Sequence, residues 1–195
     1  MRRAVCRADT WPVIGAEFAA ILARAQAGDP DAVARLYRDA QPGLLRYLRV
    51  IVPGAADDAA AETWLQVVAG LDRFSGMEME FRGWLFAIAR HRAADVGRSR
   101  SRHPTVPLAR GEGDERLTAP DTADVAAERD ATRRALMLIA ELPKDQAEII
   151  MLRVMAGLDT NTVARIVGKK PGAVRVAAHR ALRRLAATID RAGVL

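Results

Sequence analysis

A group of basic side chains in the last third of the sequence could bind nucleic acid. Arg175 stands about one helical turn before the adjacent pair His179 and Arg180. Arginine and histidine donate hydrogen bonds to base edges in the DNA major groove and to phosphate oxygens. Lys169 and Lys170 stand just before them and suit the phosphate backbone. The chemistry that this group indicates is DNA recognition.

A helix-turn-helix would position these side chains. Residues 160–168 predict a short helix that a glycine ends, and Pro171 begins a second helix that continues to about Asp190. Gly168 can take the left-handed conformation at the turn, and the amides of Gly172 and Ala173 would meet phosphates at the positive helix end. The shared core is expected to hold Val163, Ala164, Ile166, Val174 and Leu182. Farther along the second helix, two residues either contact DNA or merely solvate the helix: Arg183 and Arg184.

A second basic stretch lies in the first half of the chain, where residues 81–103 hold six arginines against one acid, Asp95. Apolar spacing predicts a helix over 81–98 with its arginines outward and these residues inward: Phe81, Trp84, Leu85, Ile88 and Val96. We interpret Trp84 as a core residue. A cationic groove with stacking surfaces is how proteins hold a single nucleic-acid strand, so this helix is a second candidate interface.

An acidic segment separates the two basic stretches. Residues 111–130 hold seven acids against two arginines, whereas residues 165–191 hold eight bases against Asp190. Residues 103–121 contain three prolines and two glycines with little apolar periodicity. We therefore expect a flexible linker between two helical blocks.

Helical patterns account for the rest of the chain. Asp29 caps a helix that Pro30 begins, and the segment Gln41-Pro42-Gly43 should break or kink it before the apolar stripe continues to Val52. A loop is expected over 73–80, and two further helices over 131–142 and 144–155. Because no strand pattern competes, the predicted fold is all-α.

The helix after residue 56 carries three carboxylates. Asp57 or Asp58 can cap it, and its apolar face is predicted to hold Ala61, Trp64, Leu65, Val68 and Leu71. Asp57, Asp58 and Glu62 could be imagined as a metal site, but a solvated helix face explains them better. We find no catalytic constellation, and we expect no cofactor and no metal.

Composition limits the class of protein. The chain has 195 residues, half of them apolar and 5% aromatic, with a formal charge of +6 that suits nucleic acid or an anionic membrane surface. Its one cysteine, Cys6, excludes an internal disulfide and fits a reducing compartment. The longest uncharged stretch, 63–71, is too short to span a membrane, and the first fifteen residues lack a signal-peptide apolar run. We expect a cytoplasmic protein without membrane insertion.

Both blocks carry residues that resemble conserved regions of bacterial sigma factors. Within 135–185 the residues similar to their fourth region are Leu142-Pro143, Gln146, Leu152-Arg153, Gly157-Leu158, Ala164, Val167-Gly168, Gly172-Ala173-Val174-Arg175 and His179-Arg180-Ala181-Leu182. Within 44–102 the residues similar to their second region are Asp58, Glu62, Leu65, Leu71-Asp72-Arg73-Phe74, Phe81-Arg82-Gly83-Trp84-Leu85, Ile88-Ala89-Arg90 and Asp95. With these two blocks alone, the chain resembles the extracytoplasmic-function group of alternative sigma factors.

The resemblance implies three binding surfaces. The helix that begins near Asp58 would contact core RNA polymerase through Asp58, Glu62 and Gln66, although capping is an equal alternative for Asp58. The loop 74–80 would capture an unstacked base of the minus-10 promoter element, and the residues holding that strand would be Phe74, Arg82, Arg90, His91 and Arg92. The minus-35 element would be bound by Lys169, Lys170, Gly172, Arg175, His179 and Arg180.

Four residues depart from the family pattern. Ala61 stands where glutamine is usual, His91 where asparagine is common, Lys170 where a capping serine or threonine is usual, and Val176 where relatives are often polar. Base preference at either promoter element therefore does not transfer to this chain.

The resemblance implies an alternative sigma factor that is not an enzyme. It would bind core RNA polymerase, direct it to promoters and assist promoter opening, and an anti-sigma protein is a further candidate partner. The linker would follow the RNA exit path of polymerase or serve as a tether. A stand-alone helix-turn-helix regulator is the alternative, although it would not need residues 58–102. The predicted organisation is a tail over 1–15, a region-2-like domain over 16–102, the linker over 103–123, and a region-4-like domain over 124–195.

Overall fold

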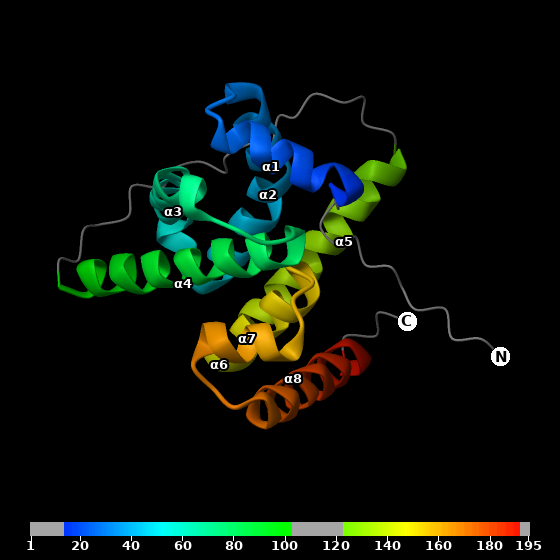
Figure 1. Cartoon of the computed structure of the whole chain (residues 1–195). Coiled ribbons are helices and arrows are strands. Elements are labelled where there is room, and N and C mark those ends of the chain that lie inside the picture. The colour runs from blue at the N-terminus through cyan, green and yellow to red at the C-terminus, as the bar shows by residue number, and fades with distance from the viewer. Residues whose placement is uncertain (1–13, 103–122, 192–195) are drawn as a thin grey trace.

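The computed structural model describes residues 14–102 and 123–191, and Figure 1 shows them as helices joined by turns. These residues contain no strand, which confirms the all-α prediction. The helices are α1 (Phe18–Gln26), α2 (Pro30–Ile51), α3 (Ala56–Gly70), α4 (Glu78–Arg102), α5 (Ala123–Ala140), α6 (Lys144–Ile150), α7 (Thr160–Val167) and α8 (Pro171–Arg191). The predicted linker lies outside the described residues, except for Ala123 at the start of α5. We call residues 14–102 the first block and residues 123–191 the second block.

The long helix α2 is the centre of the first block, and α1, α3 and α4 pack against it. Leu36, Leu44, Tyr47 and Leu48 recur at helical spacing on its buried face. The prediction that Asp29 caps this helix is confirmed, because its carboxylate accepts hydrogen bonds from the first-turn backbone amides. These features orient α3 and α4, which carry the candidate binding residues.

The prediction at 41–43 was a break or a kink, and the break is wrong because helix α2 continues through Pro42. Proline lacks the N–H that would donate to the carbonyl of Arg38, and a proline inside a helix typically costs about 3 kcal/mol. The apolar stripe stays in register across it, with Ala40 and Leu44 both buried. Packing of that stripe against the neighbouring helices outweighs the local cost.

Trp64 and Leu71 are buried as predicted, but the rest of the face that α3 turns to the core differs from the prediction. Its buried residues are Ala56, Ala59, Ala60, Thr63, Trp64 and Val67. Leu65 and Val68, expected inside, are 72% and 54% exposed, and Ala61 is also exposed. Alanines let α3 approach α2 and α4 closely, so the small side chains face inward and two larger apolar ones are left on the surface.

Neither Asp57 nor Asp58 caps α3, contrary to the prediction. The helix starts at Ala56 after a 3₁₀ turn, η2 (Pro53–Ala55), and its N-cap residue makes no side-chain hydrogen bond. Both aspartates lie exposed in the first turn, where the helix dipole favours negative charge. Asp58 is therefore available to a partner.

Helix α4 begins three residues earlier than predicted, so the expected loop 73–80 shortens to the residues between the 3₁₀ turn η3 (Leu71–Arg73) and Glu78. Phe81 and Leu85 are buried as expected, whereas Trp84 is half-buried. Arg82 was expected to point outward, but it is only 3% exposed.

The predicted helix-turn-helix is confirmed in the second block. Helix α7 ends at Gly168, whose φ of 68° places it in the left-handed region, and α8 begins at Pro171. Val163, Ala164 and Val174 are buried between these helices, but Leu182 is exposed and the smaller Ala181 occupies the core instead. Before α7, α6 continues into a π-helical turn, η4 (Met151–Met155).

Asp159 caps α7, a feature that the sequence reading missed. Its carboxylate accepts hydrogen bonds from the backbone amides of Asn161 and Thr162 and from the Thr162 hydroxyl, at 2.6 to 3.1 Å. The Thr162 hydrogen bonds lower the pKa of Asp159 below its ordinary value of 3.8.

We expect Asp159→Ala to lower the free energy of unfolding by about 1 kcal/mol at neutral pH. Because the folded-state pKa is depressed, this contribution is full above the unfolded-state pKa and is lost as pH falls through the folded-state pKa. Thermal unfolding of wild type and variant from pH 7 to pH 3 measures it. A melting-temperature gap that does not narrow below about pH 3.8 would contradict the capping role.

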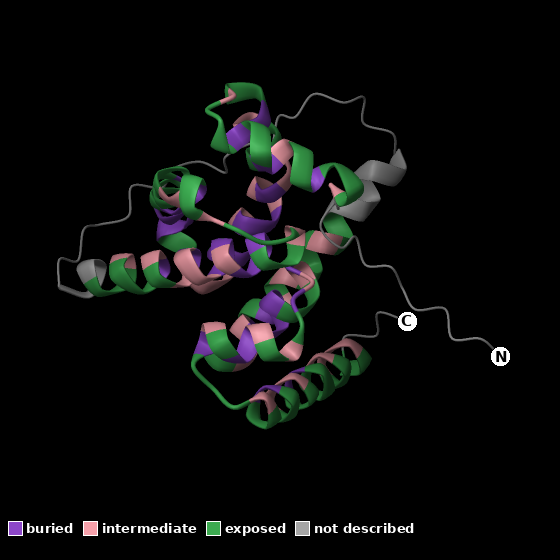
Figure 2. Cartoon of the chain, viewed as in Figure 1, coloured by how far each residue is buried: buried purple, intermediate pink, exposed green. Residues whose placement is uncertain are grey.

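The two blocks pack against each other. No pattern in the sequence predicted this contact. Helix α2 contacts α5 and α6, and α4 contacts α7. Buried side chains form one cluster that continues from the first block into the second, as the purple ribbon in Figure 2 shows. The described blocks therefore share a core.

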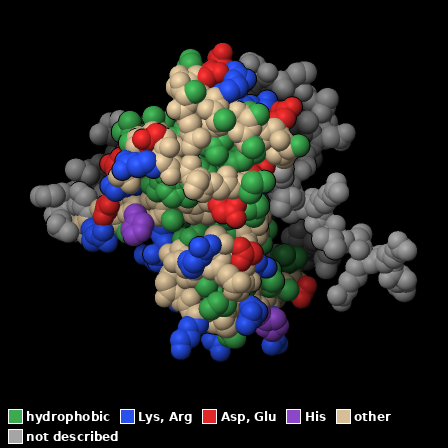
Figure 3. All heavy atoms as spheres, in the orientation of Figure 1, with side chains coloured by type: hydrophobic (Ala, Val, Ile, Leu, Met, Phe, Trp, Pro, Cys, Tyr) green, Lys and Arg blue, Asp and Glu red, His purple; other side chains and the backbone are tan. Residues whose placement is uncertain are grey.

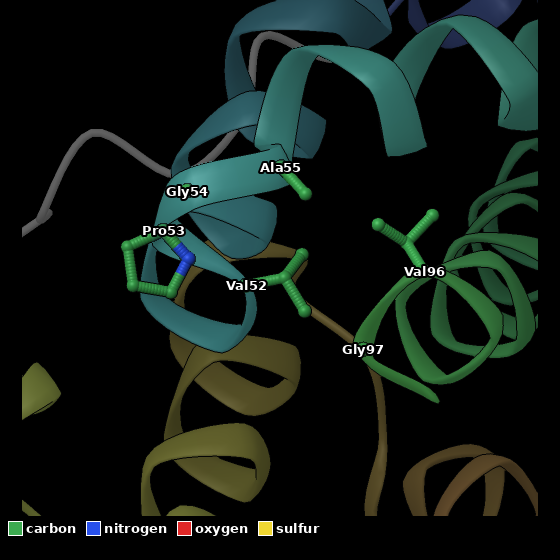
Figure 4. Close-up of a pocket in the computed structure, with 6 residues that line it drawn as sticks. All are labelled: Val52, Pro53, Gly54, Ala55, Val96 and Gly97. Carbon is green, nitrogen blue, oxygen red and sulfur yellow. The ribbon is translucent and has the colours of Figure 1, made fainter. Parts of the chain in front are cut away.

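No described helix has the length and apolar character needed to cross a bilayer, and no three acidic, His or Cys side chains among the described residues are grouped to hold a metal ion. A hollow of about 140 Å³ lies between α4 and the turn before α3. Figure 4 labels the residues that line it: Val52, Pro53, Gly54, Ala55, Val96 and Gly97. Its lining carries no titratable side chain and suggests no chemistry.

Candidate nucleic-acid interface

The first surface of interest lies on α8. Arg175, Val176, His179 and Arg180 are all exposed, and together we call them the recognition face. At 3.6 residues per turn they lie opposite the buried residue Val174, which holds α8 against the core. Lys, Arg and His side chains gather over this end of the molecule in Figure 3. The face offers base-reading donors from a helix whose orientation is fixed.

The start of α8 adds a candidate phosphate-binding element to this face. Amides of the first turn have no acceptor within the helix, and Gly172 is exposed there. Lys170 is exposed beside it, whereas the ammonium group of Lys169 is paired with the carboxylate of Asp145 at the start of α6. Lys169 therefore needs to exchange this partner before it can contact a phosphate.

The second surface is the exposed side of α3. Asp58, Glu62 and Gln66 are exposed together with Leu65 and Val68, and we call these five residues the α3 face. Two large apolar side chains among acidic and polar groups are typical of a protein-binding surface. The two apolar residues are the functional candidates that the sequence reading missed. The signal that could have located them is the row of alanines on the other side of the helix.

The third surface surrounds the loop before α4. The ring of Phe74 stacks on Trp84 with centroids 5.0 Å apart and meets Phe81 edge-on at 5.6 Å. Met77 and Met79 are exposed beside it, so aromatic and apolar side chains gather where an unstacked base is expected to bind.

The loop is held from two sides by residues that the sequence reading did not select. The side-chain amide of Gln26 donates to the carbonyl oxygens of Leu71 and Phe74 at 2.9 and 2.7 Å. Glu78 accepts hydrogen bonds from the backbone amides of Ile14 and Gly15 at 3.3 and 2.8 Å. Loop position therefore depends on α1 and on the turn before it.

The five residues predicted for the minus-10 strand do not form one open surface in this arrangement. His91 is exposed, whereas Phe74 and Arg92 are half-buried. The buried Arg82 forms an ion pair with Glu78, with 2.6 Å between Nη2 and Oε1. Arg90 forms an ion pair with Glu148 of the second block, with 2.8 Å between Nε and Oε1. Arg82 and Arg90 are thus engaged inside the protein.

Family models match both blocks of the chain. Residues 36–103 match the model described as Sigma-70 region 2, and residues 132–185 match the model described as Sigma-70, region 4. These segments contain α3, α4 and the helix-turn-helix, which carry the three surfaces.

Whole-length relatives agree with the family models. The ECF RNA polymerase sigma factor ShbA of Streptomyces griseus is 38% identical over 200 residues, covering 95% of this chain and 100% of that protein. The ECF RNA polymerase sigma factor SigD of Mycobacterium tuberculosis is 36% identical over 190 residues, covering 92% and 87%. The solved structure of CnrH in complex with the cytosolic domain of CnrY is similar with a TM-score of 0.60 at 21% identity, covering 89% of this chain and 97% of that one. That likeness supports the helical fold.

Proposed function

The chain belongs to the extracytoplasmic-function group of sigma-70 factors, and we propose that its three surfaces divide the binding of polymerase and of two promoter elements among them. As an alternative sigma factor it directs RNA polymerase to promoters, and as an initiation factor it is not an enzyme. This confirms the function that the sequence resemblance implied. The alternative of a stand-alone regulator is rejected because the chain matches the region 2 model in addition to the region 4 model.

The recognition face is proposed to bind the minus-35 element. What supports this proposal is that Arg175, His179 and Arg180 are exposed together on one side of the second helix of a helix-turn-helix. Lys170 and the amide of Gly172 would hold the adjacent phosphates, and Lys169 would join them on leaving Asp145.

The loop before α4 and α4 itself are proposed to bind the minus-10 strand. The cluster of Phe74, Trp84 and the exposed methionines supplies a stacking and apolar surface, and His91 and Arg92 lie along α4 beyond it. The α3 face is proposed to bind core polymerase. An anti-sigma protein is proposed as a further partner, on the family resemblance.

One observation carries the proposal: a single chain presents both an exposed helix-turn-helix recognition face and a separate aromatic loop. We expect core RNA polymerase to start transcription at new positions when the protein is added to a genomic template. Mapping the transcript 5′ ends should show two shared sequence elements upstream. Identical start positions with and without the protein would contradict the proposed function.

A further inference from the structure

The second block of this protein sits on the face of the first block that includes Arg82 and Arg90. Helix α7 packs on α4, and α6 and the turn η4 pack on α2 (Figure 1). The contact is continuous with the core, since buried residues from both blocks form one cluster. A packed apolar contact of this kind is more specific than a loose collision between tethered domains.

A carboxylate at the centre of this contact is shared by both blocks. Glu148 Oε1 on α6 accepts a hydrogen bond from Tyr47 Oη at 3.1 Å and another from Arg90 Nε at 2.8 Å. The Glu148 side chain is 14% exposed, and Tyr47 is fully buried. Burial and the neighbouring carboxylate raise the pKa of Tyr47, so its hydroxyl keeps its proton and donates. A carboxylate this buried needs partners, and both partners come from the other block.

The backbones also approach closely in a way that needs glycine. A Cβ added to Gly83 on α4 would lie 3.0 Å from Cγ2 of Thr162 on α7. Beside it, Arg82 Nη1 lies 3.9 Å from the position of a Cβ built on Gly157, in the loop before α7. The fit between α4 and α7 is thus shaped around Gly83 and covers Arg82.

We propose that Tyr47, Arg82, Gly83 and Arg90 form a docking face for the second block of the same chain, and that docking withholds this face from the minus-10 strand. The inference rests on the proposed function of α4. Arg90 cannot pair with Glu148 and with a DNA phosphate through the same donor. The free protein is therefore closed, and the blocks must separate before Arg82 and Arg90 can contact DNA.

The chain connectivity allows such a separation. Twenty residues, 103–122, join Arg102 of α4 to Ala123 of α5. A chain of that length spans up to about 70 Å when extended. The side-chain contacts at the docking face, rather than the covalent connection, therefore hold the blocks together.

Charge reversal at Glu148 tests the docking. Glu148→Arg places two cations side by side at Arg90, and the matched control Glu141→Arg changes the same charge at an exposed site in the turn after α5. Fluorophores on Asp72→Cys and Arg183→Cys, in a Cys6→Ser background, report the distance between blocks in the free full-length protein. We expect a predominantly short distance in wild type and in the control, and a longer, broader distribution in Glu148→Arg.

A charge swap separates docking from simple misfolding. Arg90→Glu combined with Glu148→Arg restores opposite charges and should restore the short distance, whereas a damaged fold would not recover. Circular dichroism checks that helix content is unchanged in each variant. Equal distances in wild type and Glu148→Arg, or no recovery in the swap, would overturn the docking.

A second measurement tests whether docking withholds the DNA-binding face. The probe is a fluorescent single-stranded 20-nucleotide DNA added to the free protein. We expect Glu148→Arg to bind it about tenfold more tightly than Glu141→Arg. This is the gain expected if about a tenth of the wild-type molecules are open, because the apparent affinity scales with the fraction that can bind. If Glu148→Arg binds the DNA no more tightly than Glu141→Arg, or if neither variant binds it, the proposal that docking withholds the DNA-binding face is wrong. Transcription with polymerase is scored separately, so a failed start-site assay would reject the proposed function and leave the distance result intact.

Discussion

Replacing Arg175 with alanine should weaken binding to a minus-35 element by about 1 to 3 kcal/mol, or about 5- to 150-fold. Arg175 is exposed near the start of α8 on the recognition face, next to amides that would fix the helix on phosphates. A guanidinium that donates to a base edge makes those hydrogen bonds only on the matching DNA sequence. Its removal should therefore weaken binding to that sequence and not to a scrambled one. The measurement is the affinity of the holoenzyme for a promoter fragment identified by start-site mapping, compared with one whose minus-35 element is scrambled.

Arg184→Ala is the matched control because it removes the same charge from the same helix. Arg184 lines a groove between α8 and the turn after α5, with Leu138 and Leu142 on its other side, and is not part of the recognition face. The Arg184→Ala variant should bind both DNA fragments with nearly the wild-type affinity. An equal loss on the scrambled fragment for Arg175→Ala would show that Arg175 touches only phosphate.

Glu62→Lys should weaken association with core polymerase at least about tenfold. Glu62 is exposed at the middle of the α3 face, beside Asp58 and the apolar surface of Leu65. The substitution reverses a charge where the pattern of acids favours a basic partner. Because Glu62 makes no core contact, the helix content should stay unchanged. Gel filtration or fluorescence anisotropy with core polymerase measures the affinity.

Glu17→Lys serves as the control for this variant. Glu17 is exposed in the turn before α1, away from α3, and the substitution changes the net charge by the same amount. Its affinity should match that of wild type. An unaltered affinity in Glu62→Lys would remove that residue from the polymerase-binding surface.

Several features specified by neighbouring residues could be predicted from the sequence, although the local cap at Asp159 was missed. The turn at Gly168, the start of α8 at Pro171 and the cap at Asp29 each depend on residues within one or two turns, and all three were predicted. The exposure of Arg175 and His179 follows from the same local pattern, since the buried side of α8 is apolar.

Features specified by distant residues could not be predicted. Arg90 and Glu148 are 58 positions apart in the chain, and Tyr47 and Glu148 are 101 apart, so no local pattern signals their contact. The engagement of Arg90 inside the protein depends on such a contact, whereas Arg82 pairs with Glu78 only one turn away on the same helix. The error at Ala61, Leu65 and Val68 of α3 has another cause: close helix packing selects alanine, which a count of large apolar side chains ignores.

The two hydrogen bonds that Gln26 donates to the loop before α4 determine where a fragment of the first domain has to begin. Residues 36–103 contain the match to region 2, yet Gln26 lies upstream of that match, on α1. Phe18 of the same helix packs its ring 5.6 Å from that of Phe81. A fragment trimmed to the matched segment would keep every candidate strand-binding side chain and still lose both hydrogen bonds to the loop carbonyls. A fragment that preserves the geometry of the proposed base-binding loop therefore has to start upstream of α1.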